Sequence, residues 1–203
     1  MFNKKKLNTL MMWTWSVMRK VIDCTKHSNN LINKKLKEVS VEEGRIIATE
    51  LFQILNKRGD GIGLAANQVG IDAQVAVVNV TEPLVLINPQ IVHKENEISY
   101  FEGCLSYPKK GVNTKRYEIV EVKSDNVEST MRFDGLESIC VQHEIDHLNG
   151  KTIFDRKIEI GSYKRDTKKI GRNELVTIKK GDAVKVLKYK KVQKMLNDGW
   201  EII

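Results

Sequence analysis

Residues 140–150 read CVQHEIDHLNG, with Glu144 between two histidines, His143 and His147, that are four positions apart. On an α-helix, residues four apart lie on one face, about one turn along the axis. Both imidazoles can therefore bind one metal ion, and the Glu144 carboxylate can take a proton from a water on that ion. The alternative is a helix that carries two histidines and no metal. The helix is expected over residues 136–148, because a glycine follows two positions later.

A catalytic site of this kind needs a third protein ligand and keeps one position open for water. A histidine six residues beyond the second one is excluded, because Ile153 stands there. Glu174 is a possible third ligand, because it lies downstream of the second histidine, as the glutamate ligand does in thermolysin-like enzymes. However, it lies in a basic segment without a helical pattern. The other two histidines, His27 and His93, read as surface or loop residues.

The cysteines offer another third ligand. Cys104 lies in FEGCLSYP, a glycine-containing turn that can present a thiolate from outside the helix. Cys140, on the helical face of His143, is expected to pack beneath the site as a small hydrophobic residue. With Cys24 the chain has three cysteines, an odd and sparse set, so we expect free thiols and a reducing compartment.

Helical and strand patterns alternate in the first three quarters of the chain. Residues 39–57 predict a helix that begins with a capping box of Ser40 and Glu43 and ends in the glycine-rich stretch KRGDGIG. Its apolar positions are Ile46, Ile47, Leu51, Ile54 and Leu55. Runs of valine and isoleucine predict strands at residues 74–80, 84–92 and 116–124.

The composition changes after residue 156, where the chain becomes basic and poor in large apolar side chains. LVTIKKGDAVKVLKY then predicts a hairpin that turns at Gly181 and Asp182, and KKVQKMLNDGWEII a short helix followed by a strand. We therefore expect a catalytic domain over residues 18–160 and a basic linker with a small appendage over residues 161–203. Residues 1–17 form an N-terminal arm of unassigned role.

Three segments, in order, resemble the motifs of the peptide deformylase family: GIGLAANQ (61–68), EGCLS (102–106) and QHEIDH (142–147). The resemblance extends over residues 21–155. It implies an α+β fold, with mixed or antiparallel sheets packed around a central metal-bearing helix, here followed by a C-terminal hairpin and helix. It also implies removal of the formyl group from the N-terminal formylmethionine of new polypeptides.

The resemblance further implies how the site works. The metal ligands would be Cys104, His143 and His147. The natural ion would be Fe²⁺, although Zn²⁺, Ni²⁺ and Co²⁺ suit the same donors. Glu144 would act as base and then as acid, while the Gln68 amide and the Leu105 N–H would stabilise the oxyanion. The substrate would contact Ile62, Gly63, Gly103, Leu136, Ile139 and Cys140. Separately, Arg116 and Asp146 are expected to form an ion pair that supports the metal-bearing helix.

The sequence also departs from the family. The loop KKGVNTKR after CLSYP is unusual, and KYKKVQKMLNDGWEII resembles tails of some phage-encoded deformylases.

One rival interpretation is an endopeptidase with Glu174 as the third ligand. Another is a basic RNA- or ribosome-binding module on a disabled hydrolase fold, although every residue that the chemistry requires is present.

The charge bears on partners and location. The net charge is +8, which suits an anionic partner such as the ribosome, reached through the basic C-terminal segment.

No apolar run approaches the roughly 20 residues of a membrane span. We expect the cytoplasm of a bacterium, which is also the host cell if the protein is phage-encoded, or an organelle if residues 1–17 are a transit peptide.

Overall fold

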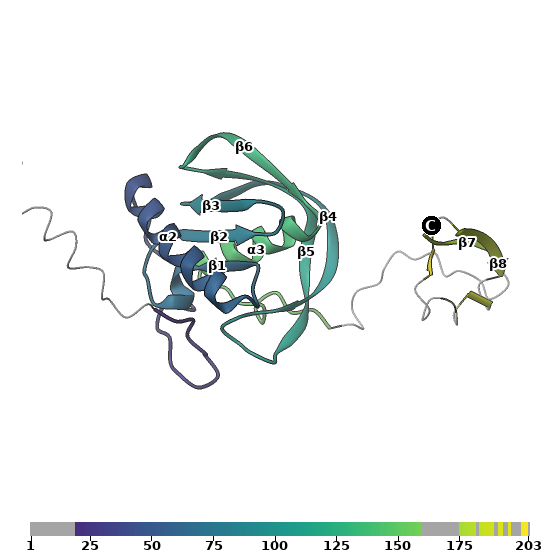
Figure 1. The fold of residues 1–203 in the computed structure, drawn as a ribbon, viewed down its shortest axis with the longest axis horizontal. Helices are drawn as coiled ribbons and strands as arrows, with labels where there is room; N and C mark the ends of the chain where they lie inside the picture. The colour runs from purple at the N-terminus through teal and green to yellow at the C-terminus, as the bar shows by residue number, and fades with distance from the viewer. Residues whose placement is uncertain are drawn as a thin grey trace, which may run out of the picture. The chain divides into compact units, whose positions relative to one another are not determined.

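The structure is a computed structural model that describes residues 19–159, 175–181, 183–188, 191–192, 195 and 200–202. The chain divides into two compact units, residues 1–160 and 161–203 (Figure 1). The N-terminal arm expected over residues 1–17 and most of the basic linker lie outside the described residues.

Helix α2 (Val41–Arg58) begins and ends where the sequence indicates. The Ser40 side chain accepts a hydrogen bond from the Glu43 N–H (3.2 Å), which satisfies one of the free donors at the helix start. Gly59 ends the helix with φ 72°, a left-handed conformation that costs glycine little. Of the apolar positions that indicated this helix, Ile46 is 74% exposed and does not face the core. It lies about half a turn away from the buried face that carries Leu51 and Leu55.

The first sheet is antiparallel, in the order β1-β2-β3. Its strands are β1 (Gly63–Ala65), β2 (Val75–Asn79) and β3 (Pro83–Ile87), with a short 3-10 helix η1 (Ala66–Val69) after β1. Every residue from 75 to 78 is fully buried, so both faces of the central strand are covered. Helices α2 and α3 both pack against it.

The second sheet, in the order β4-β5-β6, contains the long strands β4 (Gln90–Gly103) and β5 (Gly111–Ser124), then β6 (Val127–Asp134). In Figure 1 these long strands curve around the unit. The single strand expected at 84–92 is in fact two, β3 and the start of β4. The chain turns between them at Asn88, which has φ 49° and is followed by a proline.

Helix α3 (Gly135–Leu148) packs against strands of both sheets and is buried along most of its length. This is the α+β arrangement around a central helix that the sequence predicts. In the described residues, no helix combines the length and the apolar character needed to cross a membrane.

The C-terminal unit has a core of its own. Strands β7 (Leu175–Lys180), β8 (Ala183–Lys188) and β9 (Glu201–Ile202) form an antiparallel sheet in the order β8-β7-β9. The expected hairpin is present, since Lys180 pairs with Ala183 on either side of the turn. The core of this unit consists of Val176, Ile178 and Val192, with Leu187, Met195 and Trp200 packed against them.

Candidate metal centre and active site

Three side chains from two distant segments converge beside α3. The donor atoms of Cys104, His143 and His147 all lie within 4.8 Å of one another, and the Cys104 Sγ is 3.2 Å from the His147 Nε2. Among the described residues this is the group of side chains arranged to hold a metal ion. Its one thiol and two imidazoles are donors that suit Fe²⁺, Zn²⁺ and similar ions. The rival ligand Glu174 lies outside the described residues.

Local backbone structure places each donor. The two histidines are one turn apart on α3 and project to the same side. Cys104 follows the last residue of β4, and its carbonyl accepts a hydrogen bond from the Tyr107 N–H (2.9 Å). This tight turn holds the Cys104 side chain at the end of the strand, facing the helix.

A buried ion network orients His143. The Glu102 Oε2 lies 2.7 Å from the His143 Nδ1, which leaves the Nε2 for a cation. Arg116 donates to the Glu102 Oε1 (2.5 Å) and to the Asp146 Oδ2 (2.5 Å), so the expected Arg116–Asp146 pair is present. Asp146 also accepts two hydrogen bonds from Arg156. Burial raises the pKa of Glu102, but the hydrogen bonds to His143 and Arg116 outweigh it and lower this pKa to about 2.

The surroundings of His147 also fit a bound cation. Burial, together with the nearby His143, lowers the pKa of His147 well below its usual value, so His147 is in the neutral form that binds metals. The buried Nδ1 of His147 has no hydrogen-bond partner among the described residues. Burial and the Glu144 charge raise the pKa of the Cys140 thiol, which therefore stays protonated and packs beneath the site, as expected.

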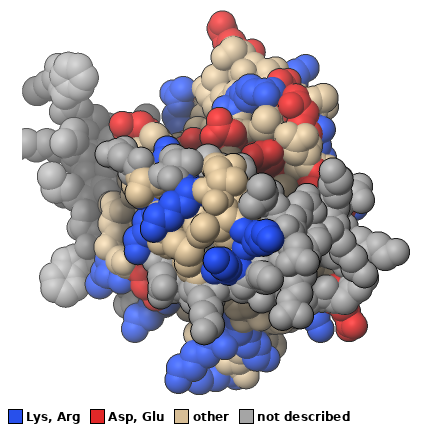
Figure 2. Space-filling view, turned by 90° about the vertical axis from the view of Figure 1, so that its right-hand side faces the viewer, with Lys and Arg blue, Asp and Glu red and all other residues tan. Residues whose placement is uncertain are grey.

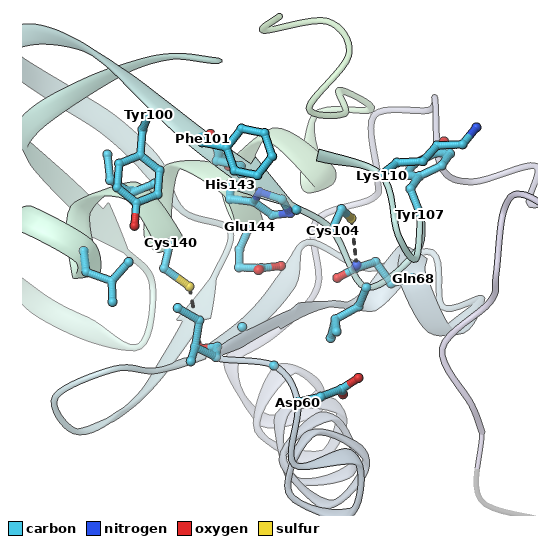
Figure 3. Close-up of a pocket in the computed structure, with 18 of the residues that line it drawn as sticks. Asp60, Gln68, Tyr100, Phe101, Cys104, Tyr107, Lys110, Cys140, His143 and Glu144 are labelled. Carbon is cyan, nitrogen blue, oxygen red and sulfur yellow. Dashed lines mark hydrogen bonds and ion pairs between the residues drawn. The ribbon is translucent and has the colours of Figure 1, made fainter. Parts of the chain in front are cut away.

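Glu144 lies in the pocket next to these donors (Figure 3). Its carboxyl group is buried, and the Oε2 has no hydrogen-bond partner in the described part of the chain. Burial raises the pKa of Glu144 to about 7. A carboxyl with this pKa can both accept and release a proton near neutral pH.

Gln68 presents its amide N–H groups to the same centre. The Gln68 Oε1 accepts a hydrogen bond from the Ala65 N–H (2.8 Å), which fixes the orientation of the amide. The Gln68 Nε2 then lies 3.6 Å from the Cys104 Sγ and 3.3 Å from the Ser106 Oγ. Leu105 also lines the pocket, directly after the cysteine.

The pocket has a volume of about 520 Å³ and opens beside the candidate metal ligands. All six residues expected to contact substrate line it: Ile62, Gly63, Gly103, Leu136, Ile139 and Cys140. The sequence reasoning missed several others, namely Asp60, Tyr100, Phe101, Tyr107, Lys109 and Lys110. It also gave no role to Glu102, the first residue of the EGCLS segment. The only sequence signal for a role of Glu102 is its position two residues before Cys104, at the start of the turn.

Known proteins are similar to this chain in sequence and in fold. The family model described as polypeptide deformylase matches residues 20–163. A peptide deformylase of Buchnera aphidicola subsp. Schizaphis graminum is 39% identical over 127 residues, which cover 56% of this chain and 76% of that protein.

Solved structures of peptide deformylases are also similar to this chain. A peptide deformylase from Synechococcus elongatus, in complex with actinonin, superimposes with a TM-score of 0.63 at 36% identity and covers 72% of this chain and 82% of that one. A probable peptide deformylase from Synechococcus phage S-SSM7 gives 0.60 at 31% identity, over 68% of this chain and 99% of that chain. The chain therefore belongs to the peptide deformylase family.

Proposed function

We propose that this peptide deformylase hydrolyses the formyl group from N-terminal formylmethionine with a divalent cation held by Cys104, His143 and His147. The convergence of these three donors within 4.8 Å, beside the buried Glu144, is the observation that carries the proposal. Such a cation supplies Lewis-acid chemistry and makes water acidic enough to ionise near neutral pH.

Residues of the chain carry out the proton transfers and stabilise the oxyanion. Glu144 accepts a proton from the attacking water and then donates it to the nitrogen of the leaving amine. The C–N bond breaks, and the products are formate and a free methionyl N-terminus. The formyl oxygen gains negative charge during the attack, and the Gln68 amide and the Leu105 N–H donate to it. One such donor is worth roughly 3 kcal/mol in the transition state.

The methionine side chain occupies the apolar end of the pocket. Ile139 and Cys140 lie on the face of α3 that also carries His143, and both are buried. Ile62 and Leu136 complete this wall and are partly exposed at its edge. An unbranched thioether fits such a surface well, because it is apolar and flexible.

The deciding experiment measures formate release from formyl-Met-Ala-Ser under anaerobic conditions, with metal analysis of the same sample. We expect iron and activity in the native protein, and loss of both in Cys104→Ser. We expect Glu174→Gln to keep both. The opposite pattern, in which Glu174→Gln alone abolishes metal binding and Cys104→Ser keeps it, overturns the proposed ligand set. Absence of formate release from the native, metal-loaded protein overturns the deformylase function.

Fe²⁺ is the proposed natural ion, on the basis of the resemblance to the peptide deformylase family. A ferrous centre with the Cys104 thiolate as a ligand is expected to be sensitive to oxygen. Activity should then decline in air with loss of iron, and Ni²⁺ or Co²⁺ should restore it. A protein that purifies anaerobically with zinc and is indifferent to air contradicts this assignment.

We also propose that residues 18–160 are the catalytic domain and that residues 161–203 dock it on ribosomes in the cytoplasm of a bacterial cell. Residues 161–203 hold twelve Lys and Arg against five Asp and Glu, so they carry +7 of the net charge of +8. Figure 2 shows the basic side chains of the visible face in several separate groups. On the sheet of this unit, Lys179, Lys185 and Lys188 are exposed. Lysines of this kind bind phosphate backbones without sequence preference.

Cosedimentation with ribosomes at increasing salt tests the docking. The double variant Lys179→Glu, Lys188→Glu should bind more weakly and lower the salt dependence of log K by roughly two. The control, Lys35→Glu with Lys123→Glu, changes the charge equally on the other unit. Equal effects of the two variants, or no salt dependence, contradict docking through residues 161–203.

A further inference from the structure

Exposed apolar side chains line the pocket together with charged residues such as Lys109 and Lys110. Among the described residues, four large hydrophobic side chains that are exposed to solvent line this pocket: Ile62, Tyr100, Phe101 and Leu136. Single exposed apolar residues are common, but a group of them around one opening is typical of a binding surface. Phe101 is the most exposed of the four, at 66%.

The backbone holds Phe101 in place. It lies near the end of β4, where Phe101 pairs with Asn113 and Gly103 pairs with Gly111. A Cβ atom at Gly111 would lie 2.5 Å from the Cζ of Phe101, so the ring rests directly on the glycine. Glu102, the next residue, points to the opposite side of the strand and is anchored by Arg116 and His143. The ring is thus an ordered apolar surface, and covering it costs little conformational entropy.

The position of the ring relative to the reacting centre indicates what covers it. Phe101 is three residues before Cys104, and Figure 3 shows it above His143 at the edge of the pocket. The proposed methionine site lies against Ile139 and Cys140 on α3, deeper in the pocket. A peptide whose first side chain occupies that site must leave through the mouth. Among the apolar residues that line the pocket, Phe101 has the largest exposed fraction and so the most area that the next side chain of the peptide can cover.

We propose that Phe101, resting on Gly111, determines specificity by contacting the side chain that follows formylmethionine and favouring a large apolar residue there. This inference rests on the proposed deformylase function. The ring offers no hydrogen bond, so its preference follows apolar area buried. Partial burial of a leucine or phenylalanine side chain against it should be worth about five- to tenfold in kcat/KM over alanine.

The experiment uses the full-length, iron-loaded enzyme and three peptides: formyl-Met-Ala-Ser, formyl-Met-Leu-Ser and formyl-Met-Phe-Ser. We expect the native enzyme to prefer the leucine and phenylalanine peptides, mainly through a lower KM. Phe101→Ala should bring the three kcat/KM values within about twofold of one another, because the apolar area is lost. Phe101→Trp should keep the preference. Iron content and thermal unfolding show whether each variant is folded.

Val92→Ala is the matched control. Val92 is on the same strand and is 47% exposed, but it does not line the pocket. This variant should keep the full preference. Equal kcat/KM values for the three peptides in the native enzyme, or a preference that survives in Phe101→Ala, overturn the role of Phe101 and leave the deformylase function standing. Absence of formate release from all three peptides overturns the deformylase function itself.

Discussion

Gly63 lies close to the carboxylate of Glu144, the proposed catalytic base. A Cβ atom at this position would lie 2.8 Å from the Cys140 Sγ and would also overlap the Glu144 side chain. Gly63 is on β1, the first strand of the sheet that packs against α3. All residues of this strand are buried, so its backbone cannot shift away from a larger side chain. Glycine is therefore required for the geometry of Glu144 and not for a special backbone angle.

We expect Gly63→Ala to lower kcat/KM for formyl-Met-Ala-Ser by about 100-fold, because a displacement of roughly 1 Å at the catalytic group has this effect. Steady-state formate release measures it. Gly59→Ala is the control. Its Cβ would meet no atom within 4 Å, and its φ of 72° makes the change a cost to stability, about 1 kcal/mol, and not to catalysis. Similar kinetic losses in both variants contradict the role given to Gly63.

Glu144→Gln tests the proton transfer itself. The amide has nearly the same shape as the carboxyl group but cannot accept a proton from water. We expect kcat to fall by roughly 10²- to 10⁴-fold while the iron content stays the same. Retained activity with bound iron means that another group is the base.

At the scale of elements, β5 and α3 are joined through Arg116. Its guanidinium is 2% exposed and bonds to Glu102 and to Asp146, each of which is buried. Removal of one partner from such a network leaves buried charges without compensation. The network also reaches His143 through Glu102. It therefore contributes to stability and to the geometry of the metal ligands at once.

Arg116→Met should lower the free energy of unfolding by about 3–5 kcal/mol. It should also weaken metal binding by roughly 10- to 100-fold, as loss of groups that orient ligands does. Urea unfolding and competition with a chelator measure the two effects. Arg132→Met, on the neighbouring strand β6, removes an exposed ion pair with Glu95 and Glu121 and should change neither quantity. Stability within error of the native protein would show that the network is not needed.

In the described part of the first unit, the helices α2 and α3 could be predicted from sequence, because their ends carry strong signals: Ser40 and Gly59 for α2, and the glycine after α3. The strands β2 and the second half of β5 were also predictable, since they are runs of valine and isoleucine. β4 and β6 were not. Most β4 residues are exposed, so no alternation of buried and exposed side chains marks this strand, and its form depends on pairing with β5.

In the candidate site, too, some residues could be predicted from the sequence and others depend on tertiary contacts. The spacing of HEIDH identifies His143, His147 and Glu144, because the chemistry itself requires those residue types at one helical turn. Cys104 is one of the candidates for the third ligand and is chosen through the family resemblance. The partners of the ligands depend on contacts between β4, β5 and α3, which no local pattern specifies. Glu102 meets Arg116 and His143 only once the strands are paired in register. Phe101 and Gly111 likewise come together only through that pairing.

At the scale of the whole molecule, the chain has two separate hydrophobic cores. In the described residues, the larger core draws its side chains from residues 21–148 and the smaller one from residues 176–200. No buried residue of one cluster belongs to the other. All of the candidate metal ligands and pocket residues lie in the first unit. The charge is divided differently, since almost all of the excess is in the second unit.

A chain ending at residue 160 should therefore fold, bind iron and release formate from formyl-Met-Ala-Ser with kcat/KM within about twofold of the full-length value. Such a short peptide makes no use of a docking unit. Processing of formylated nascent chains on ribosomes should decline in the truncated protein, and most of all near physiological salt, because its net positive charge is lower by 7 and phosphate binding depends on that charge. Parallel assays on the free peptide and on stalled ribosomes measure the two. A truncated protein that loses iron or unfolds shows that residues 161–203 belong to the catalytic fold, and one that processes both substrates normally shows that they do not dock it.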